Sequence, residues 1–179
     1  MAKKLLIITS SLRKDSNSDL LADAFAKGAE EAGNPVETIS LKGKEIRCCT
    51  GCLACQKTER CSLKDDAAEI VEKVKRADVL GFASPVYYYS VSGQLKTLLD
   101  RLNPLFPSDY GFRDVYFLSA AYENEKATFE GSVTAIQGWV DCFSKARLAG
   151  TVFAGGVGAP GEIKGHEALA EARELGRKI

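Results

Sequence analysis

The sequence is poor in the residues on which much hydrolytic catalysis depends, and it carries no excess charge. Histidine occurs once among 179 residues, as His166, and no Ser-His-Asp, HExxH or paired-carboxylate arrangement stands out. Because His166 precedes the last predicted helix, we expect it to cap that helix or to lie on the surface. Lys plus Arg and Asp plus Glu both number 24, so the formal net charge is zero. This balance argues against a nucleic acid or an anionic membrane as the main partner.

Long apolar stretches are also missing from the sequence. The longest apolar runs fall far short of the roughly 20 residues that a membrane span needs. Near the start, the run from Leu5 to Ile8 is too short for the apolar core of a signal peptide, and charge returns at Arg13. We therefore expect a cytoplasmic protein, in which cysteines stay reduced and favour metal ligation over disulfides.

Cysteine, by contrast, is concentrated in one stretch. Five of the six cysteines lie in residues 48–61, which read CCTGCLACQKTERC. Four of them follow a C-x2-C-x2-C-x5-C spacing: Cys49, Cys52, Cys55 and Cys61. Thiolates at successive three-residue intervals suit a [4Fe–4S] cluster better than structural zinc, which more often joins two separated ligand pairs. Zinc, a redox pair and free thiols remain the alternatives. Cys142 is far from this stretch, and we expect it to be buried as core packing.

The apolar pattern predicts an α/β fold. Short apolar runs at about residues 4–9, 36–41, 79–83, 115–120 and 151–154 are typical of buried parallel strands, and helical periods separate them. Such alternation predicts a flavodoxin-like three-layer sandwich with a five-stranded parallel sheet in the order 2-1-3-4-5. We expect a single domain over residues 1–179, with a cysteine-rich insertion at about 47–63.

A polar loop follows the first predicted strand. Residues 10–18 read SSLRKDSNS, and a helix that Ser16 or Ser18 can cap begins near Asp19. A strand, a polar loop and a helix N-terminus form a ready anion site. Neither G-x-G-x-x-G nor a phosphate loop of the G-x-x-x-x-G-K type is present, so a monophosphate held by hydroxyls fits better than a dinucleotide or a nucleoside triphosphate. The alternative is an ordinary capped helix, which would be the default for a serine-rich loop alone.

A second loop follows the third predicted strand. Residues 84–90 read SPVYYYS, and Ser92 and Gly93 open the next helix. Three successive tyrosines cannot all face a core, because each hydroxyl needs a partner, so we favour contact with a flat ligand or a partner subunit over a plain surface loop. Both loops leave the carboxyl ends of strands that are neighbours in the predicted order, and should flank one crevice at the switch point.

Taken in this order, the two loops and the cysteine motif resemble the flavodoxin-like NAD(P)H-dependent FMN reductases, and within them the iron–sulfur flavoproteins. The first loop matches the family pattern, with Ser10 and Leu12 where the family usually has Gly and Pro. Residues 84–87 (SPVY) and 92–96 (SGQLK) match the second loop and the helix after it, and residues 99–101 continue the match.

The resemblance implies FMN as cofactor, with NAD(P)H as a possible donor. The FMN phosphate would lie on residues of the first loop, namely Ser10, Ser11, Arg13, Ser16, Asn17 and Ser18. The isoalloxazine would lie along Pro85, Val86, Tyr87 and Tyr88, with residues from Ser119 to Tyr122 as a third contact. Cys49, Cys52, Cys55 and Cys61 would hold a [4Fe–4S] cluster.

The implied function is an FMN-dependent oxidoreductase that passes electrons from NAD(P)H or another donor to an acceptor, through the cluster. Donor and acceptor would be small molecules or redox proteins, and the protein would form a homodimer or homotetramer. Two alternatives remain: an NAD(P)H-dependent FMN or quinone reductase without a cluster, and a non-catalytic FMN electron carrier.

Overall fold

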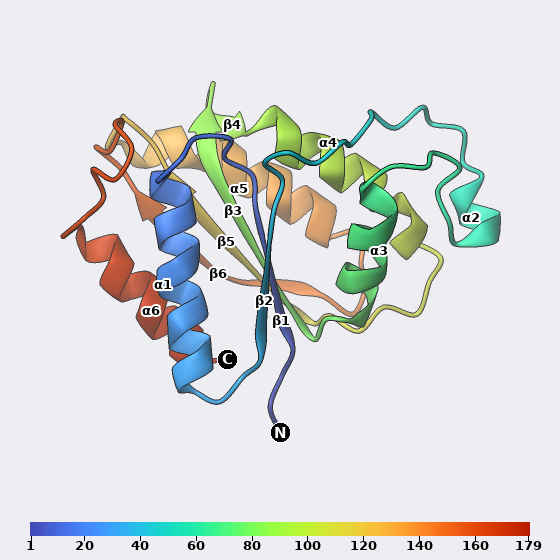
Figure 1. Ribbon diagram of the computed structural model, residues 1–179, viewed down its shortest axis with the longest axis horizontal. Helices are drawn as coiled ribbons and strands as arrows, with labels where there is room; N and C mark the ends of the chain where they lie inside the picture. Colours follow the sequence, from blue (N-terminus) through green and yellow to red (C-terminus); the bar gives the residue numbers. More distant parts are fainter.

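Five parallel strands form the centre of the computed structural model, which describes residues 1–179 (Figure 1). They lie in the order β2-β1-β3-β5-β6, and a sixth, two-residue strand, β4, pairs antiparallel with β3. The predicted order 2-1-3-4-5 is confirmed, since the fourth and fifth predicted strands are β5 and β6. The strands are β1 Leu5–Thr9, β2 Val36–Ser40, β3 Val79–Tyr87, β4 Ser90–Val91, β5 Asp114–Ala120 and β6 Arg147–Ala154.

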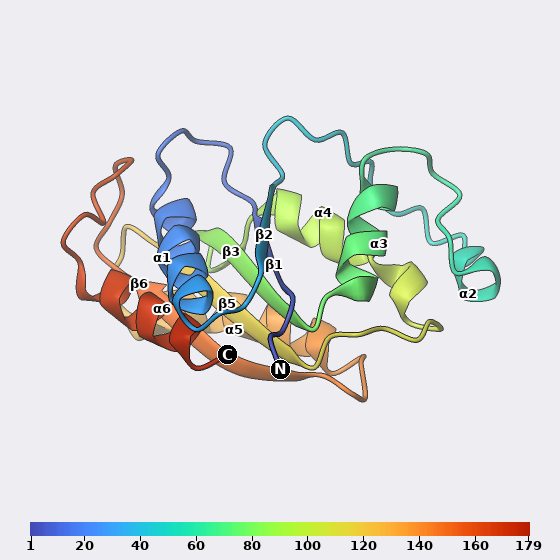
Figure 2. The same cartoon turned by 60° about the horizontal axis from the view of Figure 1, so that its bottom comes forward.

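Helices cover both faces of the sheet (Figures 1 and 2). The helices are α1 Asn17–Glu31, α2 Cys55–Thr58, α3 Ala67–Arg76, α4 Gly93–Arg101, α5 Lys126–Val140 and α6 Glu167–Arg177, with a short 3-10 turn η1 at Asn103–Leu105. Alternate residues of β1 enter different cores, because successive side chains of a strand point to opposite faces. Leu5 and Ile7 pack in the core under α1 and α6, whereas Leu6 and Ile8 pack in the core under α3, α4 and α5.

Helices α1 and α6 approach each other closely on their face of the sheet. A β-carbon at Gly28 of α1 would collide with the backbone carbonyl of Arg173, and one at Gly176 of α6 would collide with that of Phe25. Two glycines therefore set the spacing between these helices. His166 caps α6, with Nδ1 accepting a hydrogen bond from the Ala168 N–H at 3.1 Å, as the sequence predicts.

The tyrosine segment folds as a hairpin rather than as the expected strand-to-helix loop. Strand β3 does not end near Ala83 but continues to Tyr87, and the chain turns back through Tyr88 and Tyr89 into β4. Both turn residues have positive φ, 50° and 61°, as a tight two-residue hairpin requires. Such turns favour Asn and Gly, so the Tyr-Tyr pair gave no signal of this one.

The prediction for Cys142 is wrong, because this side chain is exposed. Helix α5 ends at Val140, so its apolar stripe does not extend to residue 142. The Cys142 thiol instead donates to the Gly138 carbonyl at 3.4 Å on the surface of the helix. Trp139, by contrast, packs against the core rings of Phe82 and Phe112.

None of the helices combines the length and the apolar character that a membrane span requires.

Candidate functional site

The polar loop after β1 leads directly into the N-terminus of α1. Ser16 is the N-cap, and its Oγ accepts a hydrogen bond from the Asp19 N–H at 3.2 Å. The Ser16 and Ser18 hydroxyls lie 3.1 Å apart, and both residues are buried. The first N–H groups of a helix lack carbonyl partners within it, and the helix dipole makes this end positive. The loop therefore has the backbone donors and hydroxyls of an anion site.

Asp19 in the first turn of α1 places a carboxyl group beside this loop. Burial raises the pKa of Asp19 to about 6, against the opposing hydrogen bond from Ser16. Its Oδ1 is buried and has no hydrogen-bond partner. Below about pH 6 the neutral form dominates, so Asp19 then adds little negative charge next to the helix N-terminus.

A segment near the C-terminus, residues 157–163, packs against the loop. The sequence alone did not predict this contact. The Asn17 amide donates to the carbonyls of Val157 and Ala159, at 3.3 and 2.9 Å, and its oxygen accepts from the Ile163 N–H at 3.2 Å. Arg13 Nη1 donates to the Gly158 carbonyl at 2.9 Å. The only sequence signal was the glycine-rich composition of this segment. The Asn17 side chain therefore holds the segment in place, while Arg13 keeps further donors free.

Buried serines join the two predicted loops. Ser10 donates to the Ala83 carbonyl through both its N–H and its hydroxyl, at 3.0 and 3.1 Å. Ser92, the N-cap of α4, donates its hydroxyl to Ser10 Oγ at 2.9 Å and its N–H to Ser84 Oγ at 2.9 Å. Ser119 Oγ donates to the Ser84 carbonyl at 2.7 Å. This network ties the carboxyl ends of β1, β3 and β5 to the start of α4, so the two loops are neighbours.

The hairpin presents an exposed aromatic surface at the same edge of the sheet. Pro85 and Val86 are half-buried, whereas Tyr87 is exposed and Tyr88 at the turn is 99% exposed. Tyr122 follows β5 and is 82% exposed. Uncovered aromatic rings of this kind suit contact with a flat ligand or another chain.

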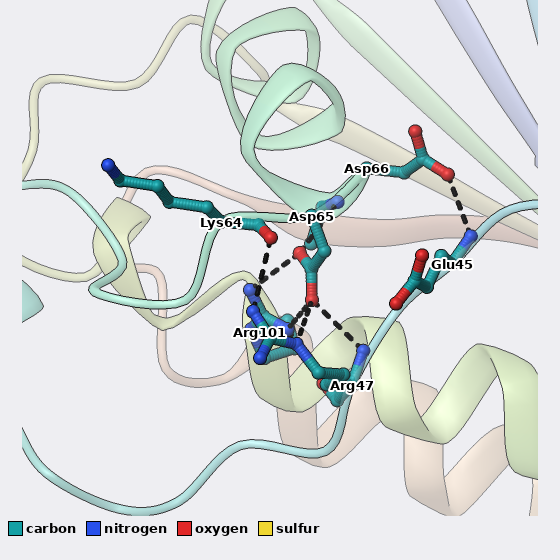
Figure 3. A network of polar contacts seen from close by, with 7 residues as sticks. Glu45, Arg47, Lys64, Asp65, Asp66 and Arg101 are labelled. Carbon is teal, nitrogen blue, oxygen red and sulfur yellow. Dashed lines mark hydrogen bonds and ion pairs between the residues drawn. The ribbon is translucent and has the colours of Figure 1, made fainter.

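The cysteine motif lies in a loop that is closed at its base by a polar stem. Figure 3 shows the residues of this stem. We call residues 48–63 the cysteine loop, and residues 45–47 with 64–66 its stem. In the stem, the Glu45 N–H donates to Asp66 Oδ2 at 2.7 Å and the Asp66 N–H donates to the Glu45 carbonyl at 3.1 Å. The Arg47 N–H donates to Asp65 Oδ2 at 3.0 Å. These bonds fix both ends of the loop, as in a compact Ω-loop.

Arg101 at the end of α4 binds both sides of the stem (Figure 3). Its guanidinium donates to the two carboxylate oxygens of Asp65, at 2.7 and 2.9 Å, and to the Arg47 carbonyl at 2.6 Å. The Arg101 and Asp65 side chains are 0% and 1% exposed. The hydrogen bond from Arg101 holds the pKa of Asp65 at about 2. Arg101 Nε, however, is buried with no partner.

The four predicted cysteine ligands line one hollow. Its wall combines the cysteine loop with the end of α4 and with η1, and includes Cys49, Cys52, Cys55, Cys61, Asp100, Arg101, Asn103 and Pro104. Cys48 does not line it, although it is next to Cys49 in the chain. The four thiols thus surround one space, but they are not arranged as a group that could hold a metal ion.

Three of these thiols already accept hydrogen bonds or have an altered pKa, and one of them is Cys49, whose sulfur accepts from the Gly51 N–H at 3.5 Å. Cys55 is buried, and its sulfur accepts from Asn103 Nδ2 at 3.0 Å. The Ala54 backbone, followed by the Ser62 hydroxyl, lowers the pKa of Cys52. Cys49 and Cys52 are exposed and Cys61 is half-buried. A lower pKa favours the thiolate, which is the form that binds metals.

Comparison with known proteins shows the family. The sequence model of the NADPH-dependent FMN reductases matches residues 3–130. An iron-sulfur flavoprotein of Archaeoglobus fulgidus is 34% identical over 180 residues, which cover 98% of this chain and 78% of that protein. An iron-sulfur flavoprotein of Methanocaldococcus jannaschii is 35% identical over 190 residues, which cover 98% and 95%. In structure, the NAD(P)H:quinone oxidoreductase from Methanothermobacter marburgensis superposes with a TM-score of 0.77 at 21% identity, covering 99% of this chain and 96% of that one.

The chain therefore belongs to the NADPH-dependent FMN reductase family, and is a flavin-dependent oxidoreductase. The predicted family and enzyme class are confirmed, as is FMN as the cofactor. The family favours an enzyme over the alternative of a non-catalytic FMN carrier.

The Arg101 and Asp65 side chains at the stem should affect stability as a pair. Arg101→Met or Asp65→Asn alone leaves one buried charge without its partner, and each should lower the free energy of unfolding by about 3 to 5 kcal/mol. The double variant removes both charges, so its loss should be far smaller than the sum. Chemical denaturation of the four proteins completes the cycle. Additive losses would show that the two side chains do not act as a pair.

The same pair should respond to acid. Because the pKa of Asp65 is about 2 in the folded chain and about 3.9 in an unfolded one, its stabilising effect is complete above about pH 4 and is lost as the pH falls towards 2. The stability difference between wild type and Asp65→Asn should therefore narrow across that window. A difference independent of pH would contradict the assignment.

Proposed function

We propose that this chain passes electrons between NAD(P)H, or another donor, and an acceptor through FMN and a [4Fe–4S] cluster held by Cys49, Cys52, Cys55 and Cys61. The observation that carries the proposal is the hollow that these four thiols line together and that excludes Cys48. The iron-sulfur flavoproteins that are similar over 98% of this chain add support.

The lining of the hollow fits a negatively charged, sulfur-rich group. Thiolates are soft ligands and prefer iron–sulfur clusters and other soft metals to calcium or magnesium. Arg101 brings a buried positive charge and an unpaired N–H to the wall, and Asn103 already donates to one sulfur. A thiolate-bound cluster would supply the negative charge and the acceptors that these groups lack.

The first loop fits the FMN phosphate through a subset of its residues. Ser11, Arg13, Ser16 and Ser18 would hold the phosphate together with the N-terminal N–H groups of α1. Ser10 and Asn17 would support the loop without contacting the phosphate. Their side chains already form hydrogen bonds with Ala83, Ser92 and the segment at 157–163.

The hairpin fits the flat part of the flavin. The isoalloxazine would lie along Pro85, Val86, Tyr87 and Tyr88, with Tyr122 as a further ring beside it. Ser119 would support this surface from below, because its hydroxyl is buried against the Ser84 carbonyl.

Helix α4 connects the two regions. Its N-cap, Ser92, belongs to the serine network under the flavin loops, and its last residue, Arg101, lines the hollow. Nine helical residues span about 14 Å at 1.5 Å per residue. When bound, FMN accepts two electrons as hydride and can release them singly, whereas a cluster carries one at a time. The chain itself fixes the spacing between the two.

A reductase without a cluster is the second candidate. The positions of the thiols favour it. Two of the four thiols are exposed, and the four are not arranged as a group that could hold a metal ion. In this version the cysteines would be free or bind zinc, and electrons would pass from NAD(P)H through FMN to a quinone or a free flavin.

We further propose a cytoplasmic protein that forms a homodimer or homotetramer. All six cysteines are unpaired, which suits a reducing compartment such as the cytoplasm. The exposed tyrosines of the hairpin suit contact with a second copy in a homodimer or homotetramer. We propose one domain with the cysteine-rich insertion at about 47–63, and redox proteins or small molecules as donor and acceptor.

Arg13→Gln tests the phosphate site. Loss of a charged donor should weaken FMN binding about tenfold or more, because a hydrogen bond to a charged group contributes about 1.5 to 3 kcal/mol. Riboflavin has no phosphate, so its affinity should not change. Fluorescence titration with both flavins measures this, and Lys14→Gln is the matched control for an exposed neighbouring cation. An equal loss for FMN and riboflavin would place Arg13 away from the phosphate.

Cys52→Ala tests the cluster against the second candidate. We expect this variant to lose cluster absorbance, iron and acid-labile sulfide while it keeps FMN and its reduction by NADPH. Cys48→Ala is the matched control, because Cys48 adjoins the motif but does not line the hollow, and it should keep the cluster. A Cys52→Ala protein with unchanged iron would exclude this residue as a ligand, and loss of FMN with the fold would make the loop structural.

A further inference from the structure

Arg101 has an unused hydrogen-bond donor in the interior of the protein. A guanidinium has five N–H donors. The Nη1 and Nη2 edge of Arg101 is taken by the Asp65 carboxylate and the Arg47 carbonyl. The Nε–H has no partner although the side chain is fully buried. A buried charged donor without an acceptor is costly, so an unmet donor of this kind points to a missing partner.

The location of Arg101 indicates what that partner is. Arg101 lines the hollow together with the four cysteines, while Asp65 does not line it. The carboxylate thus neutralises the guanidinium from the stem side, and the free donor belongs to the side chain that forms the wall. Asn103, two residues further along the chain, already donates to the Cys55 sulfur from the same wall. Arg101 at the end of α4 and Asn103 in η1 therefore both line a space bounded by sulfur.

We propose that Arg101 is a positioning residue for the iron–sulfur cluster, whose Nε–H donates to a cluster sulfur and whose charge stabilises the reduced form. This inference rests on the proposed function, since it needs a cluster in the hollow. Its physical basis is that reduction adds a negative charge to the cluster. Hydrogen bonds to the sulfurs and nearby net charge are two of the factors that set cluster potentials.

Asp65 sets how much of the Arg101 charge the cluster experiences. With Asp65 ionised, the pair is neutral as a whole, but the hollow is lined by its positive end. Asp65→Asn would leave the Arg101 charge uncompensated and keep one acceptor oxygen, whereas in the wild type Oδ2 accepts from the Arg47 N–H and Oδ1 from the Ala67 N–H. Arg101→Met combined with Asp65→Asn would remove both charges and the donor. The two changes should therefore move the cluster potential in opposite directions.

The experiment is an anaerobic redox titration of the reconstituted holoprotein, followed by visible and electron paramagnetic resonance spectroscopy. Relative to wild type, Asp65→Asn should raise the cluster potential, and Arg101→Met/Asp65→Asn should lower it. We expect each shift to correspond to about a tenfold change in the one-electron equilibrium constant, or about 59 mV. The FMN potential in the same samples is the internal reference and should move much less.

Arg47→Lys is the matched control, because Arg47 also contacts Asp65 but its side chain is 52% exposed and does not line the hollow. Its cluster potential should equal that of wild type. If the double variant does not load iron, Arg101→Lys keeps a cation for Asp65 without the guanidinium Nε–H, and it should also lower the potential.

The outcomes separate this inference from the proposed function. A wild-type protein that takes up no iron and sulfide would overturn the cluster itself. A wild-type protein that loads the cluster, with the same cluster potential in the Arg101 and Asp65 variants, would keep the cluster and overturn the role of Arg101. Equal shifts of the FMN and cluster potentials would do the same, since they would report a general change in the protein rather than a local one.

Discussion

A buried ion pair, Arg101 with Asp65, determines where the cysteines lie. Residues 48–63 contain only a single turn of helix, and little apolar surface that could fold them independently. Their position depends on the stem, and the stem depends on a guanidinium that binds Asp65 on one side and the Arg47 carbonyl on the other. Buried ion pairs add little net stability, and their attraction offsets the cost of desolvation only when the two groups are well aligned. Here the geometry brings four thiols around one space and leaves the adjacent Cys48 outside it.

The proposed FMN site depends instead on neutral hydrogen bonds. Ser10, Ser84, Ser92 and Ser119 are fully buried, and they join three strand ends to the start of α4. Small hydroxyl side chains satisfy one another here without the desolvation cost of charge, and leave the loop surface free for a ligand. Because α4 begins in this network and ends at Arg101, one short rigid helix relates the two regions. The fold thus places the two proposed sites, which differ in their chemistry, at the two ends of a single helix.

Much of this arrangement could be predicted from the sequence, because it depends on local pattern. Buried apolar runs predicted the strands, and their alternation with helices predicted the strand order. The Ser-Gly step at residues 92–93 marked the start of α4, and cysteine spacing alone selected the four cysteines that line the hollow. What could not be predicted depends on contacts distant in sequence. Nothing near Arg101 shows that it meets Asp65, 36 residues away, and nothing near Asn17 shows that it binds the segment at 157–163. The Tyr88–Tyr89 turn was missed because its residues are unusual for positive φ.

The function proposed above requires that the hollow beside Arg101 holds an iron–sulfur cluster in an FMN enzyme. The most direct measurement is the content of iron, acid-labile sulfide and flavin per chain after purification without oxygen, together with the visible spectrum. We expect flavin bands with a broad underlying cluster absorbance and about four irons and four sulfides per chain, as a cubane requires. Flavin bands with neither iron nor sulfide, after anaerobic reconstitution as well, would contradict it and leave an FMN reductase whose thiols serve another purpose.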